Sequence, residues 1–330
     1  MTGTYVTTVV YSSPFVPAEW IAAHGARPKR IRPDPGAAAR SAAPVAGMCP
    51  YARALAGEAM ALRDGQVTVF ATTCDQMRRA AEWTALETPV PVFLFNVPAT
   101  HGTPAAARLY RDELHRLGRF LARLGASEPS REKLADVMES YDARRRELRD
   151  ALGVLAPREA SEAIAAFDRD GSPPTQAAHG SLPHGVPVAV VGGPLMRNDA
   201  RVFDRIEEAG GAVVLDGTES GARTLPAPFD RRRLRDDPVL ELVDAYFGRI
   251  PDAFRRPDDA LVAWLGRELA ASGARAVVLW RYVWCDLWAA SVARLRELAD
   301  LPVLDLDVSG DEGADHRTAN RLQAFLEVLR

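Results

Sequence analysis

Short apolar and β-branched runs alternate with longer amphipathic stretches along most of this chain. Strands are predicted first at residues 5–10, 27–31, 67–71 and 90–97, and helices at 16–25, 51–62 and 75–86. The alternation returns later, with strands at 186–191, 212–215, 276–280 and 303–306 and helices at 200–209, 258–272, 287–299 and 318–329. Strands that alternate with helices are typical of βαβ units, so we expect parallel sheets.

The middle of the chain has a different pattern. Apolar residues recur there at helical spacing, as at Leu114, Leu117, Phe120, Leu121 and Leu124. Long helices without strands are therefore predicted over residues 104–168. Residues 33–47 and 169–185 are rich in turn-forming residues and are predicted to be a loop and a linker.

These patterns predict an α/β fold with two Rossmann-like lobes of parallel sheet joined by a helical segment. A chain of 330 residues usually forms about two domains. We expect an N-terminal α/β lobe at residues 1–103, a helical segment and linker at 104–184, and a C-terminal α/β lobe at 185–330.

Composition and charge narrow the class of protein. A hydrophobic content of 47%, a charged content of 26% and a net charge of −3 are ordinary for a globular protein and point to neither nucleic acid nor a membrane surface. The arginine-rich run at 231–237 carries interleaved acids and is predicted to be a solvated helix end. The first residues lack the features of a secretory signal, and no apolar run approaches the roughly 20 residues of a membrane span, so we expect a cytoplasmic protein.

Three cysteines, Cys49, Cys74 and Cys285, lie where predicted strands should end. In open α/β sheets, ligands bind beyond the carboxyl ends of the strands. Thiols that meet there would hold an iron–sulfur cluster with one iron free of protein ligands. The spacing contains no compact Cys-x-x-Cys motif, so the residues alone leave open that these are small buried hydrophobic side chains. An odd number of dispersed cysteines does not suggest a disulfide framework, which favours a reducing compartment.

Other side chains near the predicted strand ends have two interpretations each. Ser12 and Ser13 would place hydroxyl groups at the mouth of a cluster site, or would cap the helix before Pro17. Glu19 is a candidate catalytic carboxylate, or it favours the start of that helix.

Glycine and tryptophan motifs are also open to two interpretations. The turn at residues 192–194 would bind a phosphate or only end a strand. Trp280, Trp284 and Trp288 flank Cys285 and would wall a cluster or pack in the core. The histidines are scattered, and none pairs with a cysteine at a spacing that indicates hydrolase chemistry.

Several segments occur in an order that carries a resemblance to a known family. They are residues 15–19 (FVPAE), 23–28 (AHGARP), 49–51 (CPY), 73–79 (TCDQMRR), 91–98 (PVFLFNVP), 110–114 (YRDEL), 206–211 (IEEAGG), 285–286 (CD), 301–307 (LPVLDLD) and 321–327 (RLQAFLE). The chain resembles the 2-hydroxyacyl-CoA dehydratase D-component family, which also contains the cluster-bearing subunits of ATP-dependent benzoyl-CoA reductase.

The resemblance implies one oxygen-sensitive [4Fe-4S] cluster held between the lobes by Cys49, Cys74 and Cys285. It further implies a partner, either a paralogous cluster subunit or a second copy of the chain, and an ATP-dependent activator protein that supplies one electron. The implied activity is a lyase reaction in which a 2-hydroxyacyl-CoA, reduced to a ketyl radical, loses water. The alternatives are a subunit of a benzoyl-CoA-type reductase or a non-catalytic subunit whose cluster relays electrons.

Two segments depart from the family pattern. Of the family's Gln-x-Arg/Lys-Thr-Arg motif, residues 317–321 keep only the last arginine, Arg321. A second cysteine pair that occurs in some members is replaced by residues 252–254 (DAF), so a double cluster is not expected.

Overall fold

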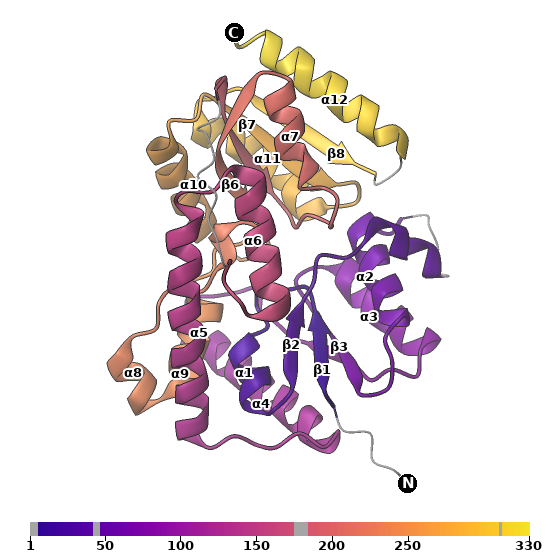
Figure 1. Ribbon diagram of the computed structural model, residues 1–330, viewed down its shortest axis with the longest axis vertical. Coiled ribbons are helices and arrows are strands. Elements are labelled where there is room, and N and C mark those ends of the chain that lie inside the picture. The colour runs from indigo at the N-terminus through magenta and orange to yellow at the C-terminus, as the bar shows by residue number, and fades with distance from the viewer. Residues whose placement is uncertain (1–5, 42–46, 175–183, 310–311) are drawn as a thin grey trace.

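The computed structural model describes residues 6–41, 47–174, 184–309 and 312–330. Parts of the first predicted strand, of the loop at 33–47 and of the linker at 169–185 lie outside these ranges. Within them the chain is α/β, with two four-stranded parallel sheets, as the alternating pattern predicts (Figure 1).

The first sheet contains β1 (Thr8–Tyr11), β2 (Arg27–Arg30), β3 (Gln66–Ala71) and β4 (Val92–Phe95) in the order β2-β1-β3-β4. All three strand pairs are parallel. The connecting helices are α1 (Ala18–Ala23), α2 (Pro50–Met60) and α3 (Asp75–Glu87). β1 and β3 are adjacent although they are not consecutive in the chain, which makes their carboxyl ends the switch point where ligands collect in such sheets.

The second sheet repeats this order with β5 (Val186–Gly192), β6 (Gly211–Thr218), β7 (Ala276–Tyr282) and β8 (Val303–Val308), arranged β6-β5-β7-β8. Its helices are α7 (Arg201–Glu208), α10 (Asp259–Ser272), α11 (Asp286–Ala299) and α12 (Glu312–Glu327). Its switch point lies between β5 and β7. Both β6 and β7 extend beyond the predicted strands, because their last residues still pair with β5 or β8.

Part of the loop predicted at 33–47 is a short 3₁₀ helix, η1 (Pro35–Arg40), which the Asp34 carboxylate caps by accepting a hydrogen bond from Gly36 N at 2.8 Å. It packs directly on α2 at Gly57. A Cβ atom at Gly57 would lie 1.8 Å from the Ala37 carbonyl oxygen, so only glycine permits this approach.

Three long helices join the lobes: α4 (Pro104–Arg123), α5 (Arg131–Leu152) and α6 (Pro157–Asp170). Figure 1 shows α5 along the left side of the molecule, and α6, which contacts both β2 and β6, between α5 and the sheets. Arg32, just after β2, donates to Ser161 Oγ of α6 at 2.9 Å and to the Ser220 carbonyl of the second lobe at 2.9 Å. One arginine therefore connects the first lobe, the helical segment and the second lobe.

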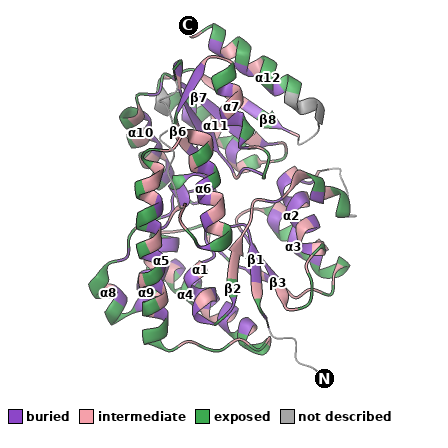
Figure 2. Ribbon diagram, viewed as in Figure 1, coloured by how far each residue is buried: buried purple, intermediate pink, exposed green. Residues whose placement is uncertain are grey.

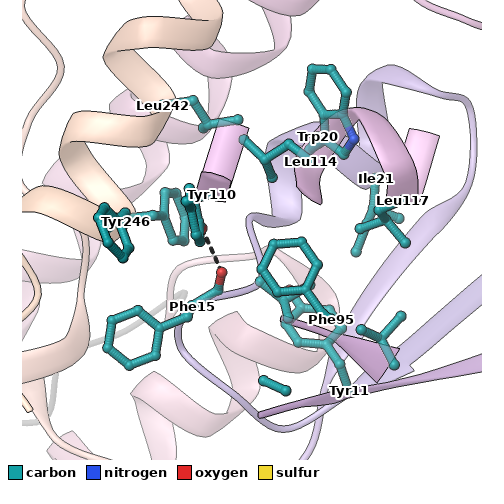
Figure 3. Close-up of a cluster of buried hydrophobic side chains, with 14 of the residues drawn as sticks. Tyr11, Phe15, Trp20, Ile21, Phe95, Tyr110, Leu114, Leu117, Leu242 and Tyr246 are labelled. Atoms are coloured by element: carbon teal, nitrogen blue, oxygen red, sulfur yellow. Dashed lines mark hydrogen bonds between the residues drawn. The ribbon is translucent and has the colours of Figure 1, made fainter. Parts of the chain in front are cut away.

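The chain returns to the first lobe after β6. A 3₁₀ turn, η2 (Ala222–Thr224), first packs against β6; the returning segment then forms α8 (Arg231–Asp236), α9 (Pro238–Val243) and a π-helical turn, η3 (Asp244–Gly248). Phe247 stacks on Tyr110 of α4 with ring centroids 4.9 Å apart, and the Tyr110 hydroxyl donates to the Phe15 carbonyl at 2.6 Å (Figure 3). The core of the first lobe is thus completed by residues that follow β6.

Buried residues are concentrated on the strands and on the inner faces of the helices (Figure 2). A second core cluster runs across both lobes, from Met48 and Leu55 to Leu195 and Tyr282. Among the described residues, no helix combines the length and apolar character needed to cross a membrane. The domain boundaries predicted above remain a prediction.

Candidate functional site

A cavity of about 390 Å³ lies where the carboxyl ends of the central strands of both sheets meet. Each of those strands contributes lining residues: β1 is followed by Ser12 and Ser13, β3 by Thr72, Thr73 and Cys74, β5 by Gly193 and Pro194, and β7 ends at Tyr282 ahead of Trp284 and Cys285. The two switch points therefore face a common space. In α/β proteins this is where ligands are expected.

All three cysteines line this cavity. Cys49 is the N-cap residue of α2, Cys74 of α3 and Cys285 of α11. A helix N-terminus carries partial positive charge and unpaired N–H groups, which favour a thiolate or another anion beside it. The N-termini of three helices therefore favour negative charge in one cavity.

Gln76 fixes the first two cysteines relative to each other. Its side-chain oxygen accepts a hydrogen bond from Cys49 N at 2.9 Å, and its side-chain nitrogen donates to the Gly47 carbonyl at 3.2 Å. Gln76 lies in the first turn of α3, directly after Cys74 and Asp75. The segment before α2 is therefore held to the start of α3.

Burial favours the protonated form of all three thiols in the metal-free chain. Burial raises the pKa of Cys49 to about 11 and that of Cys74 to about 12, and Cys285 adds to both shifts by repulsion between thiolates. Burial also raises the pKa of Cys285, with Glu219 and Asp252 adding to it. Backbone N–H groups at the helix starts oppose each shift. A coordinated metal removes the thiol protons outright.

Three free cysteines around one cavity are a donor set of the kind that iron–sulfur clusters use. In the described parts of the chain, no three His, Cys, Asp or Glu side chains come close enough to share one metal ion. An iron–sulfur cluster holds its thiolate ligands apart around its own body, and three free cysteines around one cavity suit that demand.

Ser12 and Ser13 are buried and line the cavity beside the cysteines. Neither serine caps α1, whose N-cap residue is Pro17 without a side-chain hydrogen bond. Ser13 Oγ accepts instead from Phe15 N at 3.3 Å.

Glu19 lies away from the cavity lining. Its carboxylate is fully buried, forms an ion pair with Arg145 and accepts a hydrogen bond from the Tyr246 hydroxyl at 2.6 Å. This ion pair joins α1 to α5 and the π-helical turn. The position in the first turn of α1 agrees with the helix-start interpretation.

Two of the three tryptophans line the cavity and one packs in the core. Trp284 and Trp288 line the cavity, whereas Trp280 packs in the core edge-on to Tyr282. Trp284 is 56% exposed and has a φ of 68°, a backbone conformation that bulky residues rarely adopt. Strain of this kind, next to Cys285, is typical of functional sites.

Three charged residues of the cavity region did not emerge from the sequence. Glu219 and Asp252 line the cavity, and Arg223 pairs with Asp252 at 3.3 Å while its side chain is wholly buried. Glu219 follows the polar end of β6, beyond the apolar run that predicts a strand. Asp252 was noticed only as a departure from a family motif, and Arg223 carries no sequence signal at all.

The fold and the cavity define a class: an α/β protein with two parallel sheets whose strand ends enclose a cavity lined by three cysteines. Residues 14–329 match the family described as 2-hydroxyglutaryl-CoA dehydratase, D-component. The match spans nearly the whole chain, so the protein belongs to this family, and the resemblance seen in the sequence is confirmed. A search among curated proteins finds no match.

Proposed function

We propose that this chain is the [4Fe-4S] subunit of a 2-hydroxyacyl-CoA dehydratase, a lyase that removes water from a 2-hydroxyacyl-CoA thioester. Membership of the D-component family supports a dehydratase component. The observation that carries the finer proposal is the gathering of Cys49, Cys74 and Cys285, each at a helix start, around one cavity.

In this proposal the three cysteines hold the cluster, and no fourth cysteine exists to complete its ligands. When bound, the cluster supplies one-electron chemistry, by which the thioester is reduced to a ketyl radical whose hydroxyl group can leave. The physical need is clear, because the hydrogen that must be lost as a proton lies β to the carbonyl and is otherwise poorly acidic.

The side chains around the cysteines suit such a reaction. Met77, Phe254, Leu287 and Trp288 give the cavity apolar walls that exclude water. Ser12 and Ser13 place hydroxyl groups on the same surface, where they donate hydrogen bonds to a substrate oxygen. Exclusion of water protects a reactive radical, while the hydroxyl groups orient the thioester.

The proposal includes partners. A paralogous cluster subunit, or a second copy of this chain, completes the enzyme, and an ATP-dependent activator protein delivers the electron. We place the complex in the cytoplasm, because free thiols and an oxygen-sensitive cluster require a reducing compartment.

Anaerobic reconstitution with iron and sulfide tests the proposal. The chain should bind about four irons, as one cubane requires. Addition of 2-hydroxyglutaryl-CoA to the activated complex should change the electron paramagnetic resonance signal. A chain that stays iron-free refutes the cluster. A loaded cluster that responds to benzoyl-CoA alone supports the reductase alternative, and one that responds to neither supports electron relay.

A further inference from the structure

Glu219 occupies an unusual position in the cysteine cavity. It follows β6 directly, and its backbone is held on both sides. Its N–H donates to the carbonyls of Gly192 at 3.1 Å and Gly193 at 3.2 Å, and its own carbonyl accepts from Thr224 Oγ1 at 2.8 Å. A rigid backbone therefore presents this side chain to the cavity that it lines.

Among the described residues, none holds the Glu219 carboxyl group in a structural interaction. In the described ranges of the chain, it has neither a hydrogen bond nor an ion pair, whereas Asp252 pairs with Arg223 and accepts from Phe254 N at 3.1 Å. Asp75 at the rim lies 4.0 Å from Arg78 and is 99% exposed. Glu219 is thus a cavity-lining acid that is both partly buried and free to contact a ligand.

We propose that Glu219 is the proton-transfer residue of the dehydration, an assignment that rests on the proposed function. The protonated carboxyl group gives its proton to the departing hydroxyl group as the Cα–O bond breaks, and water is released. The resulting carboxylate then takes the proton from the β-carbon, and the C–H electron pair forms the new double bond. Glu219 ends as it began, and the substrate has lost one water; the electron lent by the donor is returned.

The surrounding charges suit this role. Burial raises the pKa of Glu219 to about 7, and the Asp252 carboxylate adds to the shift, while Arg30 and Arg223 oppose it. Tyr51 from α2 and Cys285 from the start of α11 complete the titratable groups that interact with it. A general acid and base works best when its pKa lies near the operating pH.

Ser12, Tyr51 and Asp252, which also line the cavity, do not meet this requirement. Serine hydroxyl groups such as Ser12 do not accept a proton at neutral pH, and burial raises the pKa of Tyr51 far above neutrality. Asp252 is committed to Arg223, whose guanidinium also lies 5.6 Å from the Trp288 ring. Asp252 is accordingly held by Arg223, while its carboxylate adds to the raised pKa of Glu219.

Glu219→Gln keeps the shape of the side chain and removes its ability to exchange a proton. In the activated complex with 2-hydroxyglutaryl-CoA, kcat should fall by about 10²–10⁴-fold. The dependence of kcat on pH should no longer show an ionisation near neutrality. The iron content per chain should stay at the wild-type value. Glu207→Gln, the same change on the exposed surface of α7, should leave kcat and iron content unaltered.

A second variant separates chemistry from structure. Glu219→Ala opens space for a small carboxylic acid, and formate should restore part of its kcat but none of that of Glu219→Gln. If the wild type and the Glu219→Gln variant turn over substrate equally well, the assignment of Glu219 is wrong, but the proposed function stands. A wild type that binds no iron and turns over no thioester overturns the proposed function, and this assignment falls with it.

Discussion

Tyr51 of α2 and Tyr282 at the end of β7 pack ring against ring across the junction of the two lobes, with centroids 5.8 Å apart. The Tyr282 hydroxyl accepts a hydrogen bond from Met196 N at 2.8 Å and donates to Asp199. Tyr51 is two residues from Cys49, and Tyr282 is three residues from Cys285. This aromatic pair therefore ties together segments from both lobes that carry predicted cluster ligands.

Cys285→Ser should separate cofactor binding from folding. Cys285 is only partly buried, and serine has nearly its shape. The free energy of unfolding of the metal-free variant should therefore lie within about 0.5 kcal/mol of that of the metal-free wild type. The reconstituted variant should lose iron and turnover, and also the stabilisation that a bound cofactor gives the wild type. Urea titrations with and without iron check this. Wild-type turnover in the variant would exclude Cys285 as an essential ligand.

The buried Glu19–Arg145 pair should be costly to break from one side. Both side chains are at most 2% exposed, and Arg145 is also surrounded by Tyr141, Phe229 and Tyr246. Glu19→Gln strands a buried cation, so the free energy of unfolding should fall by about 3–5 kcal/mol. The exposed pair Arg232–Asp236 provides the control.

Asp236→Asn should change that free energy by no more than about 1 kcal/mol, because both partners of the surface pair are solvated.

The Glu19→Gln variant also tests the predicted catalytic role of Glu19. Folded Glu19→Gln protein that keeps its iron but has no turnover would support that role, whereas turnover in proportion to the folded fraction would support a structural one.

Gly57→Ala should destabilise the protein even though alanine favours helices by about 1 kcal/mol over glycine. The added Cβ would lie 1.8 Å from the backbone of η1, and overpacking of this kind costs roughly 1–3 kcal/mol or more. Gly153→Ala is the matched control, because its φ of −67° is helical and the nearest atom lies 3.5 Å from the new Cβ. Thermal unfolding of both variants measures the difference; equal stability would contradict the close packing of η1 on α2.

The metal-free thiols should react slowly with iodoacetamide at neutral pH. An ordinary thiol has a pKa near 8.5, so thiols with pKa values of about 11 and 12, as at Cys49 and Cys74, hold roughly 300-fold and 3,000-fold less thiolate. The rate should rise about tenfold for each pH unit until those values are reached, because only the thiolate reacts. The urea-unfolded chain is the control and should react at the ordinary rate. Fast labelling of all three thiols in the folded chain at pH 7 would contradict their burial.

Much of the sheet architecture was predictable from the sequence. Strands such as β3 and β7 are buried on both faces, so they are continuous apolar runs that stand out from the helices around them. The strand order was not predictable, because it depends on which strands pair, and a strand carries no mark of its neighbours. That order is what brings Cys74 and Cys285 to the same cavity.

The region after β6 was the least predictable part of the fold. Arg223 and Arg255 are buried there, although charged residues ordinarily indicate surface. Arg255 donates to the Phe247 carbonyl at 2.7 Å and lies over the rings of Phe15 and Phe247. Burial of this kind rests on partners far away in the chain, which no local pattern reveals. For the same reason, the sequence identified the cysteines of the site but not Glu219.

The wide separation of the cysteines has a consequence for biosynthesis. A ribosome adds about 5–20 residues per second, so the 211 residues from Asp75 to Cys285 take roughly 10–40 seconds to make. During that time the nascent chain can offer two thiols to a cluster-delivery protein but never the third. Loading of the cluster proposed above would therefore wait until β7 has left the ribosome and docked beside β5, so that an iron-bearing chain would be one whose synthesis is close to complete.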